Sequence, residues 1–114
     1  MSLSKKKKRS PRRITVEWLV ENEACPSGTI QFMEYWPKGA LLTKANLLKA
    51  ADADIDIDWL ALELLAGHSW TLFSIETQNL HHTMIFHRHD AKWRAANKEY
   101  VDILWHHLKK EGIV

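Results

Sequence analysis

Histidine is concentrated toward the C-terminal end of this 114-residue chain. The six that cluster there are His81, His82, His87, His89, His106 and His107. Neutral imidazole is the commonest metal ligand in proteins and suits borderline metals. If residues 81–89 form a strand, His87 and His89 share one face, as two ligands of one ion should. No cysteine lies near, and the spacing matches no standard zinc motif, so a surface tract without a metal explains the cluster more simply.

Acidic residues alternate with apolar ones in the middle of the chain. Counted from Asp52 as position 1, acids occupy positions 3, 5, 7 and 12, which is the ligand spacing of an EF-hand calcium loop. The glycine required at position 6 is replaced by Ile57, and only glycine permits the sharp turn there. The pattern therefore favours a turn, with Asp58 as the N-cap of the helix that follows and the other carboxylates in solvent.

Charge is divided unevenly along the chain. Residues 1–13 hold seven bases and no acid, residues 14–76 hold ten acids and three bases, and residues 77–114 hold six bases and four acids, for a net charge of +2. The seven bases are Lys5, Lys6, Lys7, Lys8, Arg9, Arg12 and Arg13. A polybasic segment next to an acidic body attracts phosphates or acidic surfaces. We expect residues 1–13 to form a disordered arm, because like charges repel and nothing apolar is present to bury.

This arm also suits salt-sensitive, sequence-independent binding of nucleic acid. Four bases predicted on the last helix extend the basic track: Arg94, Lys98, Lys109 and Lys110. The acidic middle of the chain would repel DNA, however, and no helix-turn-helix, zinc-finger or RNA-recognition motif is present.

The pattern of residues 14–114 predicts one compact, mainly α domain, which is a small helical bundle. Thr15, Pro26 and Thr43 mark the starts of three short helices. A fourth, from Trp59 to Leu65, is apolar nearly all round, which predicts a buried central helix that ends at Gly67.

Two segments complete the predicted fold. Residues 69–87 are aromatic and β-branched around Gln78 and Asn79, which favours a small β-hairpin, with a helix as the alternative. Asp90 caps a long C-terminal helix that runs to Glu111. Its buried stripe comprises Trp93, Ala96, Tyr100, Val101, Leu104 and Leu108. On its polar face, Lys98 and Asp102 are four residues apart and can pair.

The six tryptophans are mostly expected in the core, although Trp93 or Trp105 could anchor a partner. Cys25 is the single cysteine, which excludes an internal disulfide and fits a reducing compartment. We expect it to be a small buried residue at a helix start. No run of 18 apolar residues occurs, so the sequence predicts no membrane span and a cytoplasmic location, or a nuclear one in a eukaryotic cell.

One stretch resembles a short helical module that recurs in small proteins of phages and prophages. It reads Glu21-Asn22-Glu23-Ala24-Cys25-Pro26-Ser27-Gly28, then Phe32, Pro37-Lys38-Gly39, Thr43, Asn46-Leu47-Leu48-Lys49-Ala50-Ala51 and Asp56-Ile57-Asp58-Trp59-Leu60. The likeness covers about residues 14–65. It implies an accessory protein of a mobile element that acts on a host component, and it assigns no catalytic residue. Asp54 stands where the module tends to have glycine, and an aspartate in the left-handed conformation can replace it.

From these features we expect a non-enzymatic phage or prophage accessory protein, without a cofactor, that binds a host protein and plausibly inhibits a DNA-processing or defence factor. The arm and the C-terminal half would make the contact. The alternative is a small nucleic-acid-binding protein that uses the arm and the last helix. A metal-dependent nuclease built on the histidine cluster is a third, remote hypothesis.

Overall fold

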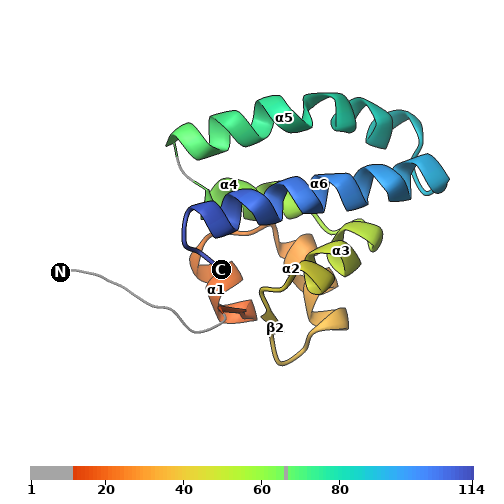
Figure 1. The fold of residues 1–114 in the computed structure, drawn as a ribbon. Helices are drawn as coiled ribbons and strands as arrows, with labels where there is room; N and C mark the ends of the chain where they lie inside the picture. Colours follow the sequence, from red (N-terminus) through yellow and green to blue (C-terminus); the bar gives the residue numbers. More distant parts are fainter. Residues whose placement is uncertain (1–11, 66) are drawn as a thin grey trace.

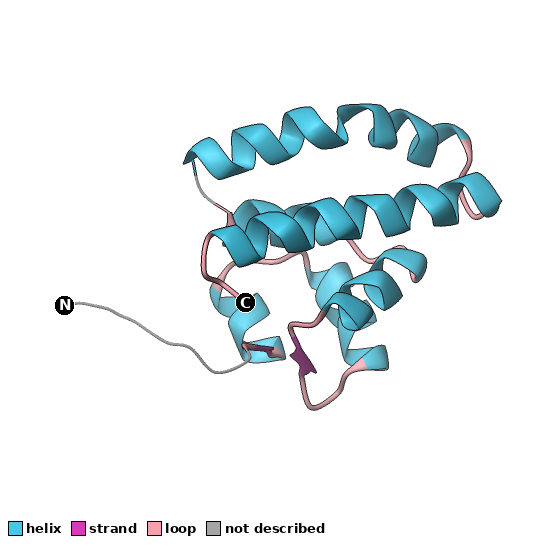
Figure 2. Ribbon diagram, in the orientation of Figure 1, coloured by secondary structure: helices cyan, strands magenta, loops and turns pink. Residues whose placement is uncertain are grey.

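The computed structural model describes residues 12–65 and 67–114, which form helices and one very small sheet (Figures 1 and 2). In chain order the elements are β1 (Arg13–Ile14), α1 (Val16–Glu21), α2 (Pro26–Tyr35), β2 (Ala40–Leu41), α3 (Lys44–Asp52), α4 (Ile57–Leu64), α5 (Gly67–Phe86) and α6 (Ala91–Lys110). The mainly α fold and the long C-terminal helix are confirmed. The predicted disordered arm falls mostly on residues 1–11, outside the described residues, while Arg13 belongs to β1.

Three of the predicted helix starts are confirmed in atomic detail. The side chains of Thr15, Thr43 and Asp90 each accept a hydrogen bond from the backbone N–H three residues on, at 3.0, 3.1 and 2.9 Å. These bonds satisfy N–H groups that have no partner within the first turn of a helix. Pro26 is the first residue of α2, where its missing N–H costs nothing.

The two short strands pair antiparallel and bring the start of the chain to the loop between α2 and α3. Arg13 lies opposite Leu41, and Ile14 lies opposite Ala40. Gly39 precedes β2 with φ of 91°, and a Cβ atom there would lie 3.0 Å from the Ile14 carbonyl oxygen. Both the backbone angle and the close approach require glycine at this position.

Residues 67–86 form one continuous helix, so the predicted hairpin is wrong. The residues that α5 turns inward recur every three or four positions, as a helix requires: Trp70, Phe73, Thr77, Leu80 and Met84. Its outward side also carries Ile75, Ile85 and Phe86, which are exposed. Apolar residues on both sides hide the helical period, which is why the segment looked like strands.

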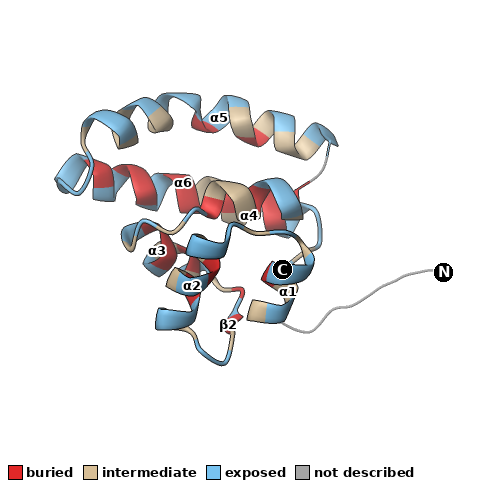
Figure 3. Cartoon of the chain, turned by 180° about the vertical axis from the view of Figure 1, so that it is seen from behind, coloured by how far each residue is buried: buried red, intermediate tan, exposed pale blue. Residues whose placement is uncertain are grey.

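The last two helices run side by side, and the chain reverses between them at residues 87–90 (Figure 1). α5 lies on one side of α6 and α1, α2 and α3 lie on the other, while α4 lies behind α6 in Figure 1, where its Asp58 approaches His81 of α5. All six residues of the predicted stripe of α6 are buried, and Figure 3 shows buried positions recurring along the helix between exposed ones. The predicted pair of Lys98 and Asp102 is also present, with 3.3 Å between Nζ and Oδ2.

Helix α4 departs from its prediction at both ends. Its N-cap is Asp56, which accepts a hydrogen bond from the Trp59 N–H at 3.1 Å, and not Asp58. The helix starts earlier because Ile57 is buried and therefore belongs to its first turn. α4 is also not buried all round, since Leu62 is 51% exposed. Gly67 does not end α4 but begins α5.

Apolar side chains gather in two clusters. The larger joins α3, α4, α5 and α6, and the smaller contains Ile14, Leu19, Phe32 and Ala40. Trp36 and Leu60 pack against both clusters. Within the described residues, no helix is both long enough and apolar enough to cross a membrane.

Candidate functional site

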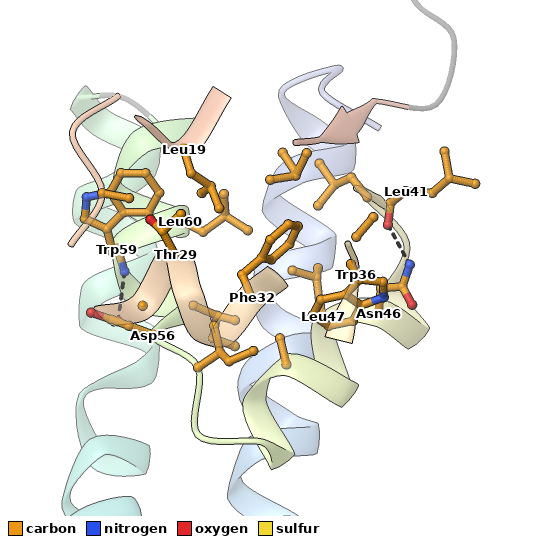
Figure 4. Close-up of a pocket in the computed structure, with 18 of the residues that line it drawn as sticks. Leu19, Thr29, Phe32, Trp36, Leu41, Asn46, Leu47, Asp56, Trp59 and Leu60 are labelled. Carbon is orange, nitrogen blue, oxygen red and sulfur yellow. Dashed lines mark hydrogen bonds between the residues drawn. The ribbon is translucent and has the colours of Figure 1, made fainter. Parts of the chain in front are cut away.

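A cavity of about 130 Å³ lies where the two apolar clusters meet, and we call it the apolar cavity (Figure 4). Six elements contribute to it: β1, α1, α2, β2, α3 and α4. Its main apolar lining residues are Leu19, Phe32, Trp36, Leu47, Trp59 and Leu60. The lining also includes exposed residues, among them Cys25 and Leu41, so the cavity reaches the surface.

Four polar side chains of the lining already have hydrogen-bond partners in the backbone. The Thr29 hydroxyl donates to the Cys25 carbonyl at 3.1 Å, and the Asn46 amide donates to the Leu41 carbonyl at 2.8 Å. Thr43 and Asp56 accept the capping hydrogen bonds of α3 and α4. Polar groups engaged in this way hold the walls together, and what remains to face the cavity is largely apolar. Any group that binds in the cavity should therefore be apolar too.

Helix α2 forms one wall of the apolar cavity. Phe32 and Thr29 are its buried residues, and Phe32 points into the space between the lining residues of α4 and α3 (Figure 4). The Gln31 side chain donates a hydrogen bond to the Ala53 carbonyl at 2.9 Å, which ties α2 to the segment between α3 and α4. The outward side of α2 carries Ile30 and Met33, both exposed.

Cys25 lies at the edge of the apolar cavity and is exposed, so the prediction that it is buried is wrong. It is the N-cap residue of α2, and a residue just before the first turn projects from the end of the helix. A hydrogen bond with the Ser27 hydroxyl, 3.1 Å from Sγ, lowers the thiol pKa, and the backbone N–H groups of Gly28 and Ser27 act in the same direction.

A second, polar pocket of about 270 Å³ lies between α5, α6 and the segment that joins α3 to α4. Here Asp58 accepts a hydrogen bond from the Tyr100 hydroxyl, and His81 Nε2 lies 3.4 Å from the same carboxylate oxygen. Burial of the phenol, reinforced by the Asp58 carboxylate, raises the Tyr100 pKa far above its ordinary value. Tyr100 therefore stays protonated and links α6 to α4 as a hydrogen-bond donor, not as a base.

The alternating aspartates do not converge on one point. Asp52 accepts from the Asn97 amide at 3.1 Å, Asp54 pairs with Arg88, Asp56 caps α4, and Asp58 binds Tyr100. The four carboxylates thus bind four different residues, on α4, on α6 and in the turn after α5, which is not the arrangement of a calcium loop. Asp54 has φ of 62°, so the expectation of a left-handed aspartate at this position is confirmed.

The histidines are dispersed as well. His81 faces Asp58 and Tyr100, whereas His82 is exposed. His87 and His89 follow the end of α5 in a turn, so the suggestion that they share a strand face is wrong. His87 Nδ1 lies 3.0 Å from Asp90, and the His89 ring packs on Trp93 with 4.8 Å between centroids. Within residues 12–65 and 67–114, no three potential ligands from His, Cys, Asp or Glu lie close enough together to hold a metal ion.

The residues predicted to bind a partner are partly accessible. The predicted basic residues of α6 are all exposed: Arg94, Lys98, Lys109 and Lys110. Arg12 and Arg13, at the other end of the described chain, are exposed as well. Lys5, Lys6, Lys7, Lys8 and Arg9 lie outside the described residues. Trp93 is only 4% exposed, so its ring offers a partner almost no surface, and Trp105 is half-buried against the larger cluster.

The sequence reasoning missed the apolar cavity altogether. Its walls come from residues far apart in the chain, so no local spacing marks it. Its aromatic lining residues, Phe32, Trp36 and Trp59, gave no signal either, because tryptophan and phenylalanine occur at a similar density in the rest of the described chain. Comparisons of the chain with protein-family models, with curated proteins and with solved structures find no match.

Proposed function

We propose that this is a non-enzymatic accessory protein of a phage or prophage that binds a protein of the host cell, and that the apolar cavity receives an apolar side chain of that partner. The observation that carries the proposal is the cavity itself, which is lined by apolar side chains and reaches the surface beside Leu41. The binding energy of protein interfaces is concentrated where aromatic or aliphatic anchors enter desolvated pockets of this kind.

The size of the cavity matches one anchor residue. An apolar cavity of about 150 Å³ holds a single benzene ring. The apolar cavity, at about 130 Å³, therefore suits one phenylalanine or leucine side chain. Because the polar lining residues are already engaged with the backbone, the anchor needs no hydrogen-bonding group of its own.

The surrounding charge indicates the chemistry of the partner. Residues 14–76, which supply the whole lining, carry ten acids and three bases. A partner that presents an apolar anchor among basic residues complements this acidic stretch, and an acidic group beside the anchor would meet the exposed Arg13 opposite Leu41 at the mouth, because complementary charge speeds association and rejects wrong partners. Basic surfaces are typical of proteins that handle nucleic acid, which supports a DNA-processing or defence factor as the target and a cytoplasmic site of action. The resemblance of residues 14–65 to a phage module supports a target in the host.

Two substitutions test the cavity in capture experiments from nuclease-treated host-cell lysate. Ala50→Leu fills the cavity from α3, and Leu41→Lys places a charge at its mouth. The matched controls are Ala45→Leu, on the exposed side of α3, and Leu62→Lys, on the exposed side of α4. We expect the wild type and both controls to capture a discrete protein partner. The amount captured should fall at least tenfold with either cavity variant.

Circular dichroism and thermal unfolding establish that each variant is folded before its capture is compared. Undiminished capture by Ala50→Leu and Leu41→Lys would rule out the cavity as the contact. Capture that disappears in the nuclease-treated samples would move the assignment to the nucleic-acid alternative. The same comparison with residues 14–114 alone shows whether the basic arm contributes.

A further inference from the structure

The outward side of α5 carries a regular stripe of four exposed residues, Ile75, Asn79, His82 and Phe86. Ile75 is 63% exposed and Phe86 is 77% exposed, although both are large and apolar. On a helix these positions lie opposite the inward residues, which include Phe73 and Thr77, so the stripe faces away from the core, and α5 itself lies at the edge of the molecule (Figures 1 and 3). Ile85, next to Phe86, is 66% exposed as well, so large apolar residues adjoin one another at the C-terminal end of α5, as they do at an interaction surface.

The spacing of the stripe is four, three and four residues, which places its members on one side of a helix and is the spacing of a coiled-coil seam. This spacing reads the same in both directions. Two copies of α5 placed antiparallel therefore bring Ile75 opposite the partner's Phe86 and Asn79 opposite the partner's His82. Each contact then occurs twice, as a two-fold axis requires.

The chemistry of the stripe is also self-complementary. Glu76 is the single Asp, Glu, Lys or Arg residue of α5, and its carboxylate lies 2.9 Å from His107 on α6. Two stripes can thus approach without repulsion between like charges, which would otherwise oppose the pairing of identical surfaces. At the centre, the Asn79 amide can donate to an imidazole nitrogen of the partner's His82. A polar pair within an apolar seam selects one register and one orientation.

We propose that two copies of this chain associate through antiparallel pairing of their α5 helices, about a two-fold axis between residues 80 and 81. About this axis only residues 75–86 of each α5 overlap, a length of about 18 Å, so the seam is small and lies below the roughly 1,200 Å² at the lower end of specific interfaces. The dimer should accordingly form at micromolar concentrations. The helices α1, α2 and α3, which supply much of the lining of the apolar cavity, lie on the other side of α6 from α5, so the two surfaces are separate (Figure 1).

The first test is the mass of the full chain in sedimentation equilibrium, from low micromolar to submillimolar concentration. We expect a shift from monomer to dimer for the wild type, and a dissociation constant at least tenfold weaker for Ile75→Lys and for Phe86→Lys. Ile30→Lys, at a residue 61% exposed on α2, is the matched control and should dimerise like the wild type. Circular dichroism confirms that each variant is folded. A wild type that stays monomeric throughout, or a dimer that both α5 variants leave intact, would overturn the proposal.

The second test fixes the orientation. Asn79→Cys and His82→Cys are prepared separately in a Cys25→Ser background, mixed and oxidised mildly, and the products are separated by intact mass. Antiparallel pairing predicts a disulfide mainly between the two different variants. A parallel pair would instead link Asn79→Cys to itself, and that outcome would rule out the proposed arrangement.

Discussion

The Nε2 atom of His107 lies 2.9 Å from a carboxylate oxygen of Glu76, and this contact joins α6 to α5. His107 is buried and its ring also packs edge-on against Phe73, whereas the Glu76 side chain is half exposed. A buried imidazole anchored in this way sets the position of α5 along α6. The alignment matters because the outward stripe of α5 is presented from that position.

We expect Glu76→Ala to lower the free energy of unfolding by about 1 kcal/mol, because a hydrogen bond is lost and the buried imidazole loses its partner. His107→Ala should cost more, about 2–3 kcal/mol, since it also opens a cavity beside Phe73. Urea unfolding of both single variants and the double variant measures the coupling. A coupling energy near zero would show that the two residues do not interact. Glu63→Ala, on the exposed side of α4, is the control.

Gly28→Ala should stabilise the protein. Gly28 lies within α2, and a Cβ atom added there meets no heavy atom within 4 Å. Alanine loses less backbone entropy than glycine in a helix, so we expect a gain of about 0.5–1 kcal/mol in urea unfolding. Gly39→Ala is the contrasting variant and should destabilise, because its φ is positive and the new Cβ would press on the Ile14 carbonyl. Equal effects of the two substitutions would contradict this account.

Asp90 should contribute stability that is lost in acid. The Trp93 N–H, followed by the side chain of His87, lowers the carboxyl pKa in the folded protein. A depressed folded pKa stabilises the protein above the unfolded value of about 3.9 and ceases to do so as pH falls through the folded value. We expect Asp90→Asn, which keeps the cap but not the charge, to be less stable than the wild type at neutral pH and equal to it below both pKa values. Urea midpoints of both proteins, measured from pH 7 down to the acid limit of folding, test this expectation. A difference between the two midpoints that does not change with pH would argue against it.

The Cys25 thiol should react with iodoacetamide at lower pH than an ordinary cysteine. Its hydrogen bond with the Ser27 hydroxyl is the main cause of the lowered pKa, and the thiolate is the reactive form. We therefore expect Ser27→Ala to move the midpoint of the alkylation rate to higher pH without changing the fold. Mass spectrometry follows the rate at this single cysteine. Identical pH midpoints of alkylation for the wild type and Ser27→Ala would exclude the Ser27 hydroxyl as the cause of the lowered thiol pKa.

Features that depend on neighbours along the chain were predictable from the sequence. Thr15, Thr43 and Asp90 cap helices because each side chain reaches a backbone N–H only three residues away. The buried stripe of α6 follows from the helical period alone. Asp54 adopts the left-handed conformation that was expected of an aspartate at this position.

Features that depend on tertiary packing were not predictable from the sequence. Both Asp56 and Asp58 precede an apolar stretch, and only the burial of Ile57 decides that Asp56 is the cap. In α5, apolar residues point both to α6 and away from it, so the sequence pattern could not show which side is the core.

What the sequence alone determined is therefore the set of helices whose signals are local, the division of charge and the mainly α class. The tertiary structure decided that residues 67–86 are helical, that the aspartates and histidines separate to different partners, and that a cavity opens between α2, α3 and α4. The physical reason is the range of the interactions. A cap or a helical stripe is complete within a few residues, whereas a cavity and an exposed face exist only once distant segments have packed together.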